Sequence, residues 1–379
     1  MTATIARLAT RPLRVPLRRP WGPDVRDLSL VEVVVEDSDG ATGYGFSWTP
    51  SIGAAAVRAH LDHDIAAFAL GRAAEASALW QPLWEHLHEG GGGGITTMAM
   101  AGLDLALWDL AARRAGVGIT DHLGRHHDAA IVYGSGVNLH YPLDELVAQA
   151  ERWVAAGFDA VKVKVGSPDV ARDVERIAAV RQVIGPERRL MLDANQRWSL
   201  GQAERAIGEL SSFDLAWIEE PLRADDLAAH VDLRRRIEVP VALGENLYTR
   251  YRFAEFIDAG VVDVVQPNLV RVGGITPFLA IADLAAERGV ALAPHLLLEL
   301  SAQLALALPG EHLVEAVEDA SFEALGALAE PSPVIVSGAT VYTTGRPGLG
   351  VRFTSELTDV TASSELTDAA ASVRPTEEP

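Results

Sequence analysis

From residue 131 onward, short apolar runs alternate with amphipathic segments of helical period, and this alternation limits the fold more than any other feature of the sequence. Alternation of this kind is typical of strand–helix units that build a parallel sheet. Eight apolar runs are predicted to be strands, at 131–136, 160–165, 189–194, 214–218, 239–243, 262–266, 290–293 and 312–316. The seven segments between them are predicted to be helices, at 142–156, 168–184, 199–212, 225–236, 249–259, 274–288 and 299–307. Because eight parallel strands close a barrel and no comparable eighth helix follows, the predicted fold is a TIM-like α/β barrel of the (β/α)7β type.

The residues before the barrel follow another pattern, which predicts an α+β capping domain. Alternating segments predict strands at 4–16, 28–36 and 42–47, and segments of 3.6-residue period predict helices at 52–70, 75–88 and 96–115. Two short strand patterns, at 334–336 and 341–343, are expected to return to this domain. The predicted boundaries are 1–125 for the N-terminal part of the cap, 126–325 for the barrel, 326–353 for the C-terminal return and 354–379 for a disordered acidic tail.

Composition excludes several classes of function. The formal charge of −20 repels nucleic acid and anionic membrane surfaces, so neither is expected as a partner. The chain has no cysteine, which excludes disulfides, thiolate metal ligands and a cysteine nucleophile. The first 21 residues alternate apolar residues with arginines, so we expect no signal peptide or membrane span and a cytoplasmic location.

The basic residues are unevenly divided between two types. Of the 32 lysines and arginines only two are lysines, Lys162 and Lys164, and they are two positions apart on one predicted strand. Lysine can lose its proton near neutral pH, whereas arginine effectively cannot. The pair therefore indicates a base.

Polar residues follow the predicted barrel strands, where the active sites of such barrels lie. The candidates are Lys162, Lys164, Asp193, Asn195, Glu219, Glu245, Asn268, His295 and Glu315. From one strand end to the next they are separated by 20 to 31 residues, about one strand–helix unit each. We therefore expect them to meet at one mouth of the barrel.

Three of these candidates, Asp193, Glu219 and Glu245, are carboxylates on neighbouring strands, and they cannot lie ionised side by side without a counter-charge. A divalent cation supplies one. Oxygen ligands without cysteine fit Mg²⁺ better than Zn²⁺, and they also suit Mn²⁺. Glu220 follows Glu219 directly and is not counted as a ligand.

Opposite the cation, the two lysines are expected to lower each other's pKa by mutual repulsion, which would leave one of them neutral. A neutral lysine beside a metal-chelated carboxylate can remove the α-proton of that carboxylate, with the metal stabilising the enediolate. His295, five strands further along, is expected on the other side of the mouth.

Six motifs together resemble the enolase superfamily and, within it, the mandelate racemase group. They are A-V-K-V-K at 160–164, D-A-N at 193–195, W-I-E-E-P at 217–221, G-E-N at 244–246, V-G-G-I-T at 272–276 and H-L-L-L-E-L-S-A-Q-L at 295–304. The resemblance implies that Asp193, Glu219 and Glu245 bind Mg²⁺, that Lys164 and His295 are bases for opposite faces of the substrate, and that Lys162 holds its carboxylate. It also implies that Glu315 donates a hydrogen bond to that carboxylate, and that the chain forms a homo-oligomer.

One position departs from the family pattern. The histidine is usually paired with an aspartate, whereas this chain has Asn268, which can accept from the ring N–H but gives no charge to stabilise an imidazolium. His295 should then be a weaker base, which favours dehydration, a reaction that needs one base. The apolar candidates for the substrate pocket argue against an acid sugar, because they suit an aryl or alkyl substituent. They are Trp21, Trp48, Val137 and Leu296.

The sequence therefore leaves several functions open. Racemisation or epimerisation of a small 2-hydroxy carboxylate is narrowly preferred to dehydration of an acid sugar. Two remoter alternatives are a metal-free glycosidase, which would not explain the lysine pair, and a barrel that binds a carboxylate without turnover.

Overall fold

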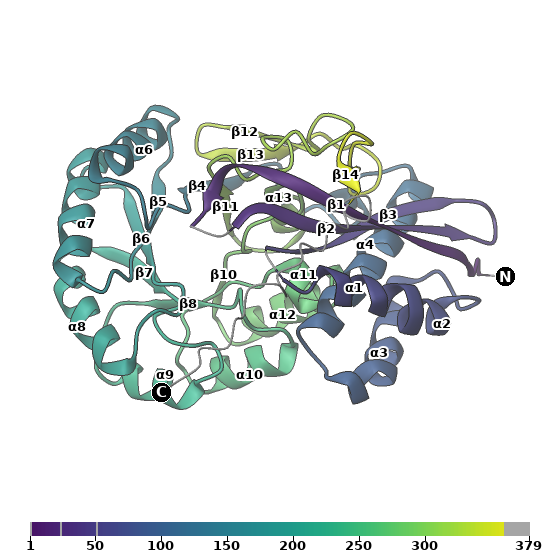
Figure 1. The fold of residues 1–379 in the computed structure, drawn as a ribbon, viewed down its shortest axis with the longest axis horizontal. Coiled ribbons are helices and arrows are strands. Elements are labelled where there is room, and N and C mark those ends of the chain that lie inside the picture. The colour runs from purple at the N-terminus through teal and green to yellow at the C-terminus, as the bar shows by residue number, and fades with distance from the viewer. Residues whose placement is uncertain (1, 23–24, 51, 360–379) are drawn as a thin grey trace, which may run out of the picture.

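The computed structural model describes residues 2–22, 25–50 and 52–359 and consists of a barrel with a cap at one side (Figure 1). The cap contains an antiparallel sheet in the order β14-β1-β2-β3. Its strands are β1 (Ile5–Trp21), β2 (Val25–Asp37), β3 (Thr42–Thr49) and β14 (Thr358–Asp359). The three predicted N-terminal strands are present, and β1 and β2 are longer than predicted.

Helices cover one face of the cap sheet. They are α1 (Ala54–His60), α2 (Ala66–Ala69), α3 (Ala76–Leu87) and α4 (Ile95–Ala115), with a π-helical turn at Leu61–Ile65 joining α1 to α2. The next helix, α5 (Ile119–Leu123), packs on α4 and on the barrel helix Leu298–Ala307. Helix α4 packs directly on β3, because a Cβ atom at Gly43 would lie 2.1 Å from the carbonyl oxygen of Ala106. Among the described helices, α4 alone has the length and hydropathy to cross a membrane, but 78% of its apolar window is buried inside the fold.

The barrel contains the eight predicted parallel strands. They are β4 (Ala130–Ser135), β5 (Ala160–Lys164), β6 (Arg189–Asp193), β7 (Leu215–Glu219), β8 (Val241–Leu243), β9 (Val264–Val265), β10 (Ala291–Leu292) and β11 (Leu313–Val317). Each pairs with its neighbour from β4 to β10, and β11 pairs in parallel with β4. The (β/α)7β architecture with an α+β cap is confirmed.

Helices follow seven of these strands and surround the barrel. They are α6 (Leu143–Ala155), α7 (Val170–Ile184), α8 (Leu200–Leu210), α9 (Leu227–Arg234), α10 (Arg250–Asp258), α12 (Ile275–Glu287) and α13 (Leu298–Ala307). A short additional helix, α11 (Leu269–Val272), precedes α12 and was not predicted. Local signals start several of them: Ser199 and Gln202 form a capping box at α8, and Asp169 caps α7 through the backbone N–H of Ala171.

The C-terminal return differs from its prediction. Strands β12 (Val334–Ser337) and β13 (Thr340–Thr343) form a hairpin, and β13 pairs with barrel strand β4. The prediction that they return to the cap is wrong, because β13 pairs with Ala130 and Ile131 at the start of β4, a stretch that β5 does not pair. The chain reaches the cap later, where Phe353 packs edge-to-face on Phe46 and β14 pairs with β1. The predicted tail at 354–379 therefore begins too early, and residues 360–379 lie outside the described part of the chain.

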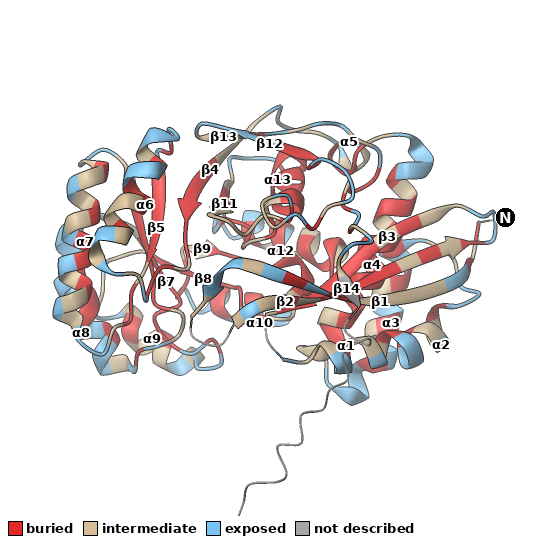
Figure 2. Ribbon diagram, turned by 45° about the horizontal axis from the view of Figure 1, so that its top comes forward, coloured by how far each residue is buried: buried red, intermediate tan, exposed pale blue. Residues whose placement is uncertain are grey.

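Three clusters of buried apolar residues hold the described part of the molecule together, and buried residues are red in Figure 2. The largest runs from the barrel wall to one face of the cap sheet, where it includes Leu30, Phe46 and Trp48. A second lies between the other face of that sheet and the cap helices, and the third is formed by side chains of the barrel strands, among them Met191 and Trp217. The cap sheet is thus buried on both faces, and its barrel-facing side chains stand over the mouth of the barrel.

Candidate active site

A cavity of about 210 Å³ lies at the carboxyl ends of the barrel strands, under the cap. It is lined by Trp21, Trp48, Pro50, Ser135, Val137, Lys164, Asn195, Glu245, Arg271, His295, Leu296, Glu315 and Val317. Nine of these were predicted from the sequence. The other predicted residues, Lys162, Asp193, Glu219 and Asn268, are buried beside the cavity rather than on its wall. Strand register brings the group together, since Lys164 is level with Asp193 and Asp193 with Glu219.

The two lysines occupy different environments. The Nζ atom of Lys162 has no exposed surface and lies 2.8 Å from Glu219 and 2.8 Å from Glu315. Lys164 lines the cavity, and its Nζ donates to Asp193. Burial lowers the pKa of both lysines, but the neighbouring carboxylates outweigh it and raise both. The predicted mutual repulsion is present, and in this arrangement Asp193 stabilises the Lys164 ammonium. A neutral lysine opposite a bound cation stays a prediction.

Carboxylates outnumber the lysines in this cluster. Burial, with Asp193 nearby, raises the pKa of Glu219 to about 8. Burial and then Glu245 raise the pKa of Glu220 well above its ordinary value. The positive charge of Lys162 lowers the pKa of Glu219 but does not offset burial and Asp193. The positive charges in the site therefore do not balance its buried carboxylates.

The donor atoms fit a cation. One ligand atom each from Glu219, Glu245 and His295 lie within 4.8 Å of one another, and Asp193 is level with Glu219 on the next strand. Neighbours also orient the carboxylates: Gln266 donates to Glu219 at 2.7 Å, and Asn246 donates to Glu245 at 3.0 Å. Orienting donors of this kind are typical of metal sites.

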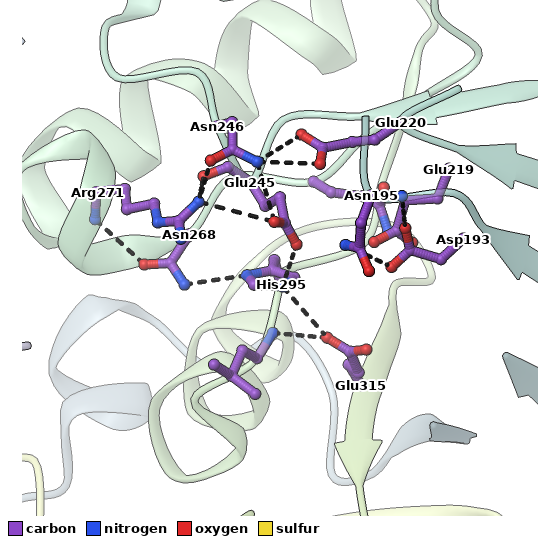
Figure 3. A network of polar contacts seen from close by, with 12 residues as sticks. Asp193, Asn195, Glu219, Glu220, Glu245, Asn246, Asn268, Arg271, His295 and Glu315 are labelled. Carbon is purple, nitrogen blue, oxygen red and sulfur yellow. Dashed lines mark hydrogen bonds and ion pairs between the residues drawn. The ribbon is translucent and has the colours of Figure 1, made fainter. Parts of the chain in front are cut away.

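Gln266, Asn246 and Arg271 were not predicted as site residues. Asn246 directly follows Glu245, and Gln266 is two positions before Asn268, so proximity to the strand ends was the available signal. The guanidinium of Arg271 donates to the Glu245 carbonyl at 2.9 Å and to the Asn246 side chain. Arg271 thus holds the strand end that carries Glu245 (Figure 3).

His295 is held on both ring nitrogens. Its Nε2 lies 2.6 Å from Glu245, and its Nδ1 lies 3.0 Å from the Asn268 side-chain nitrogen. The orientation of the Asn268 amide follows from its other contacts, because its oxygen caps α11 by accepting the backbone N–H groups of Val270 and Arg271, each at 3.1 Å. The amide nitrogen must therefore face His295.

This geometry corrects the predicted role of Asn268. An amide nitrogen donates, so Nδ1 of His295 accepts and the ring proton is on Nε2, facing the cavity. Asn268 was expected to accept from the ring N–H, which the helix cap prevents. In this tautomer the Nε2–H of His295 donates to Glu245, and neither ring nitrogen has a free lone pair for a substrate.

Glu315 accepts hydrogen bonds from its neighbours. Its carboxylate accepts from Lys162, from the Ser135 hydroxyl at 2.7 Å and from the backbone N–H of Leu296 at 2.9 Å. Against the effect of burial, Lys162 and then His295 lower the pKa of Glu315 to about 2. Glu315 is therefore an acceptor in this arrangement, and its donation to a substrate carboxylate, which the family resemblance implies, stays a prediction.

The loops around the cavity contain strained backbone. Asn195, Glu220 and Leu296 directly follow the strand-end segments of β6, β7 and β10, and all three have positive φ, at 44°, 41° and 55°. Positive φ is costly for residues with a Cβ atom and is concentrated at functional sites. At these positions the positive φ changes the direction of the backbone as it leaves the strand at the barrel mouth.

Together, a (β/α)7β barrel and a mouth lined by two lysines, carboxylates on successive strands and a histidine define an enolase-type barrel. Residues 2–124 match the family model described as "Mandelate racemase / muconate lactonizing enzyme, N-terminal domain", and residues 145–357 match "Enolase C-terminal domain-like". The chain belongs to the mandelate racemase/muconate lactonizing enzyme family of the enolase superfamily.

Two named enzymes and one crystal structure are similar to this chain. The chain is 38% identical to a 3,6-anhydro-alpha-L-galactonate cycloisomerase from Streptomyces coelicolor, over 86% of this chain and 89% of that protein. It is 37% identical to an L-talarate/galactarate dehydratase from Salmonella typhimurium, over 82% of this chain and 80% of that one. A crystal structure described as a racemase from Streptomyces coelicolor with bound magnesium superimposes with a TM-score of 0.86 at 36% identity, covering 92% of this chain and 97% of that one.

Proposed function

We propose that this protein is a Mg²⁺-dependent enzyme that removes the α-proton of a 2-hydroxy carboxylate with Lys164, and that an oxygen substituent then leaves the β-carbon, as in the dehydration of an acid sugar. The observation that carries the proposal is the placement of the two lysines: Lys164 alone lines the cavity, whereas Lys162 is sealed against Glu219 and Glu315. The similar dehydratase and cycloisomerase support it.

The proposed ligands of Mg²⁺ are Asp193, Glu219 and Glu245. Bound there, Mg²⁺ would supply the positive charge that the carboxylates lack and stabilise negative charge on the substrate. Engaging Asp193 in this way would free Lys164 from the carboxylate that raises its pKa, while repulsion from Lys162 would persist. Lys164 could then accept a proton.

The elimination balances as follows. The α C–H bond breaks and its proton goes to Nζ of Lys164, while the electron pair becomes the double bond between the α- and β-carbons. The β C–O bond breaks, and the departing hydroxyl takes a proton back from the Lys164 ammonium and leaves as water, so that Lys164 is neutral again. The resulting enol tautomerises to a 2-oxo acid. Nε2–H of His295 contacts Glu245 in the structure, and it is proposed to donate a hydrogen bond to the departing oxygen when Glu245 is engaged as a metal ligand.

Racemisation or epimerisation is the second candidate, and the cavity wall favours it. Trp21, Trp48, Val137 and Leu296 line the cavity as predicted, and they suit an apolar substituent better than a chain of hydroxyl groups. Racemisation requires a second base, however. The tautomer that Asn268 imposes on His295 removes the lone pair that such a base needs, so we place elimination first.

A screen of acid sugars and 2-hydroxy acids with Mg²⁺ in D₂O, followed by proton NMR, tests the proposal. Elimination predicts a 2-oxo-3-deoxy acid, whereas racemisation predicts α-deuteration of both enantiomers without a new product. Excess EDTA should abolish either reaction, and activity that survives EDTA would support the metal-free glycosidase. Binding without exchange or product would support the non-catalytic alternative. A cytoplasmic location and a homo-oligomer stay predictions.

A further inference from the structure

The V-G-G-I-T motif at 272–276 joins α11 to α12 and contacts the cap rather than the cavity. Asp104, in cap helix α4, accepts the backbone N–H of Thr276 at 3.1 Å and its hydroxyl at 2.5 Å. The indole N–H of Trp108 donates to the same hydroxyl at 2.9 Å, and that of Trp80 donates to the Gly273 carbonyl at 2.8 Å. Figure 1 shows α4 beside α11 and α12.

The two glycines permit this contact. Gly273 and Gly274 have φ values of 104° and 109°, a region that favours glycine. A Cβ atom on Gly274 would lie 2.2 Å from a carboxylate oxygen of Asp104, and one on Gly273 would lie 3.1 Å from the Trp80 ring. The motif is therefore shaped to receive cap side chains at its backbone.

The other end of the same segment is in the active site. Asn268 contacts His295, and Arg271 holds the carbonyl of Glu245. The segment between them and Thr276 is short and internally bonded, since the N–H of Gly274 donates to the Leu269 carbonyl at 2.8 Å. A displacement at the cap contact would therefore reach both site residues.

We propose that Asp104 is a positioning residue: by anchoring the segment 268–276 to the cap, it sets the placement of Asn268 on His295 and of Arg271 on Glu245. Asp104 is 3% exposed, and its hydrogen-bond partners within the described residues are the backbone and hydroxyl of this segment. Burial raises the pKa of Asp104 to about 7, so retaining this acid is unfavourable for stability at neutral pH. A role in placing the site residues explains why it is there.

The alternative is that Asp104 only docks the cap, and Asp109 provides the matched control. Asp109 is also in α4 and also buried, and it accepts two hydrogen bonds as Asp104 does, in its case from the backbone N–H groups of Tyr44 at 2.9 Å and Leu349 at 2.7 Å. It makes no hydrogen bond to the segment 268–276. Asp104→Asn and Asp109→Asn each replace a buried acid with a raised pKa by an amide and should change the thermal midpoint alike, while only the first should disturb the site.

Two measurements on the purified full chain report directly on the placement of His295 and of the proposed metal ligands. The first is the ¹⁵N spectrum of the His295 ring in metal-free protein, assigned by its loss in His295→Gln. Asp104→Asn should shift or broaden these signals, and Asp109→Asn should leave them at the parent positions. The second is a Mn²⁺ titration, in which Asp104→Asn should weaken binding by about tenfold and Asp109→Asn by less than about twofold.

The inference is overturned if Asp104→Asn leaves both the ring signals and the Mn²⁺ affinity at parent values, or if Asp109→Asn changes them equally. If Asp104→Asn does not fold, Thr276→Val removes the hydroxyl contact and Thr276→Ser retains it, so only the valine variant should shift the ring signals. The Mn²⁺ measurement rests on the proposed function. A parent protein that binds no Mn²⁺ would contradict that function, while the ring signals would still decide the role of Asp104.

Discussion

At the scale of single residues, the two lysines have separate tasks despite their identical chemistry. Lys162 is enclosed by Glu219 and Glu315, so its charge balances the carboxylates. Lys164 lines the cavity, where it can reach a substrate. Their spacing of two positions on β5 puts both on one face, and depth along the strand separates their environments.

Replacing Lys164 by arginine tests its role as the base. The guanidinium keeps a positive charge near Asp193 but cannot accept a proton, so the fold should persist while α-proton exchange falls by about 10²- to 10⁴-fold. Proton NMR in D₂O with any accepted substrate measures the rate, and circular dichroism checks the fold. Exchange at the parent rate would show that another group removes the proton.

Asn268→Asp tests how the tautomer of His295 limits the reaction. One aspartate oxygen can still cap α11, and the other would face Nδ1 of His295, which must then carry a proton. Nε2 gains a lone pair, and the charge stabilises an imidazolium. We expect exchange on the His295 face of the substrate to rise at least about tenfold.

Exchange on the Lys164 face is the internal control for that variant and should change little. The measurement is α-proton exchange of each enantiomer in D₂O. If the unmodified enzyme already exchanges both enantiomers equally, and the aspartate variant does the same, Asn268 does not restrain His295.

At the scale of elements, the short helix α11 and the glycine pair after it couple two parts of the fold. The side chain that caps α11 also contacts His295, so a helix terminus and an active-site contact depend on one amide. The glycine pair then lets α4 approach the backbone closely. Neither element has a strong apolar periodicity of its own.

Gly274→Ala should be strongly destabilising, because the added Cβ atom would overlap Asp104 and φ is 109°. We expect the free energy of unfolding to fall by about 2 to 4 kcal/mol. Gly208→Ala is the control: this glycine is exposed on α8 with no atom within 4 Å of its Cβ position, and the alanine should stabilise by about 0.5 to 1 kcal/mol. Urea denaturation measures both, and equal effects would contradict the close contact.

At the scale of the whole molecule, charge connects stability to the metal. The chain has a formal charge of −20, and part of that excess is concentrated in buried carboxylates at the barrel mouth. A divalent cation that binds only the folded state must therefore raise stability, by about 2.7 kcal/mol at a concentration a hundred times its Kd.

We predict that MgCl₂ raises the thermal midpoint, whereas NaCl at the same ionic strength raises it less. Glu219→Gln should abolish the Mg²⁺-specific part, because it removes a proposed ligand charge while the barrel core is unchanged. Glu204→Gln, a change at an exposed ion pair with Arg236, should keep it. A thermal shift that is the same for both salts would argue against a specific metal site.

The sequence by itself determined the barrel, its strand order and most of the cavity wall. Apolar runs and amphipathic helices alternate with a clear period, and successive parallel strands must end on one side, so Lys164, Asp193 and Glu219 could be placed together by spacing alone. The capping box at Ser199 is likewise a local signal.

Only the tertiary structure decided which atoms face each other. Whether Asn268 accepts from His295 or donates to it depends on where its oxygen is engaged, and that follows from the position of α11, a one-turn helix without a sequence period. The hairpin partner of β4 and the contact of Asp104 with Thr276 join residues more than 170 positions apart. Contacts of this kind depend on packing between elements, about which local propensity and periodicity contain no information.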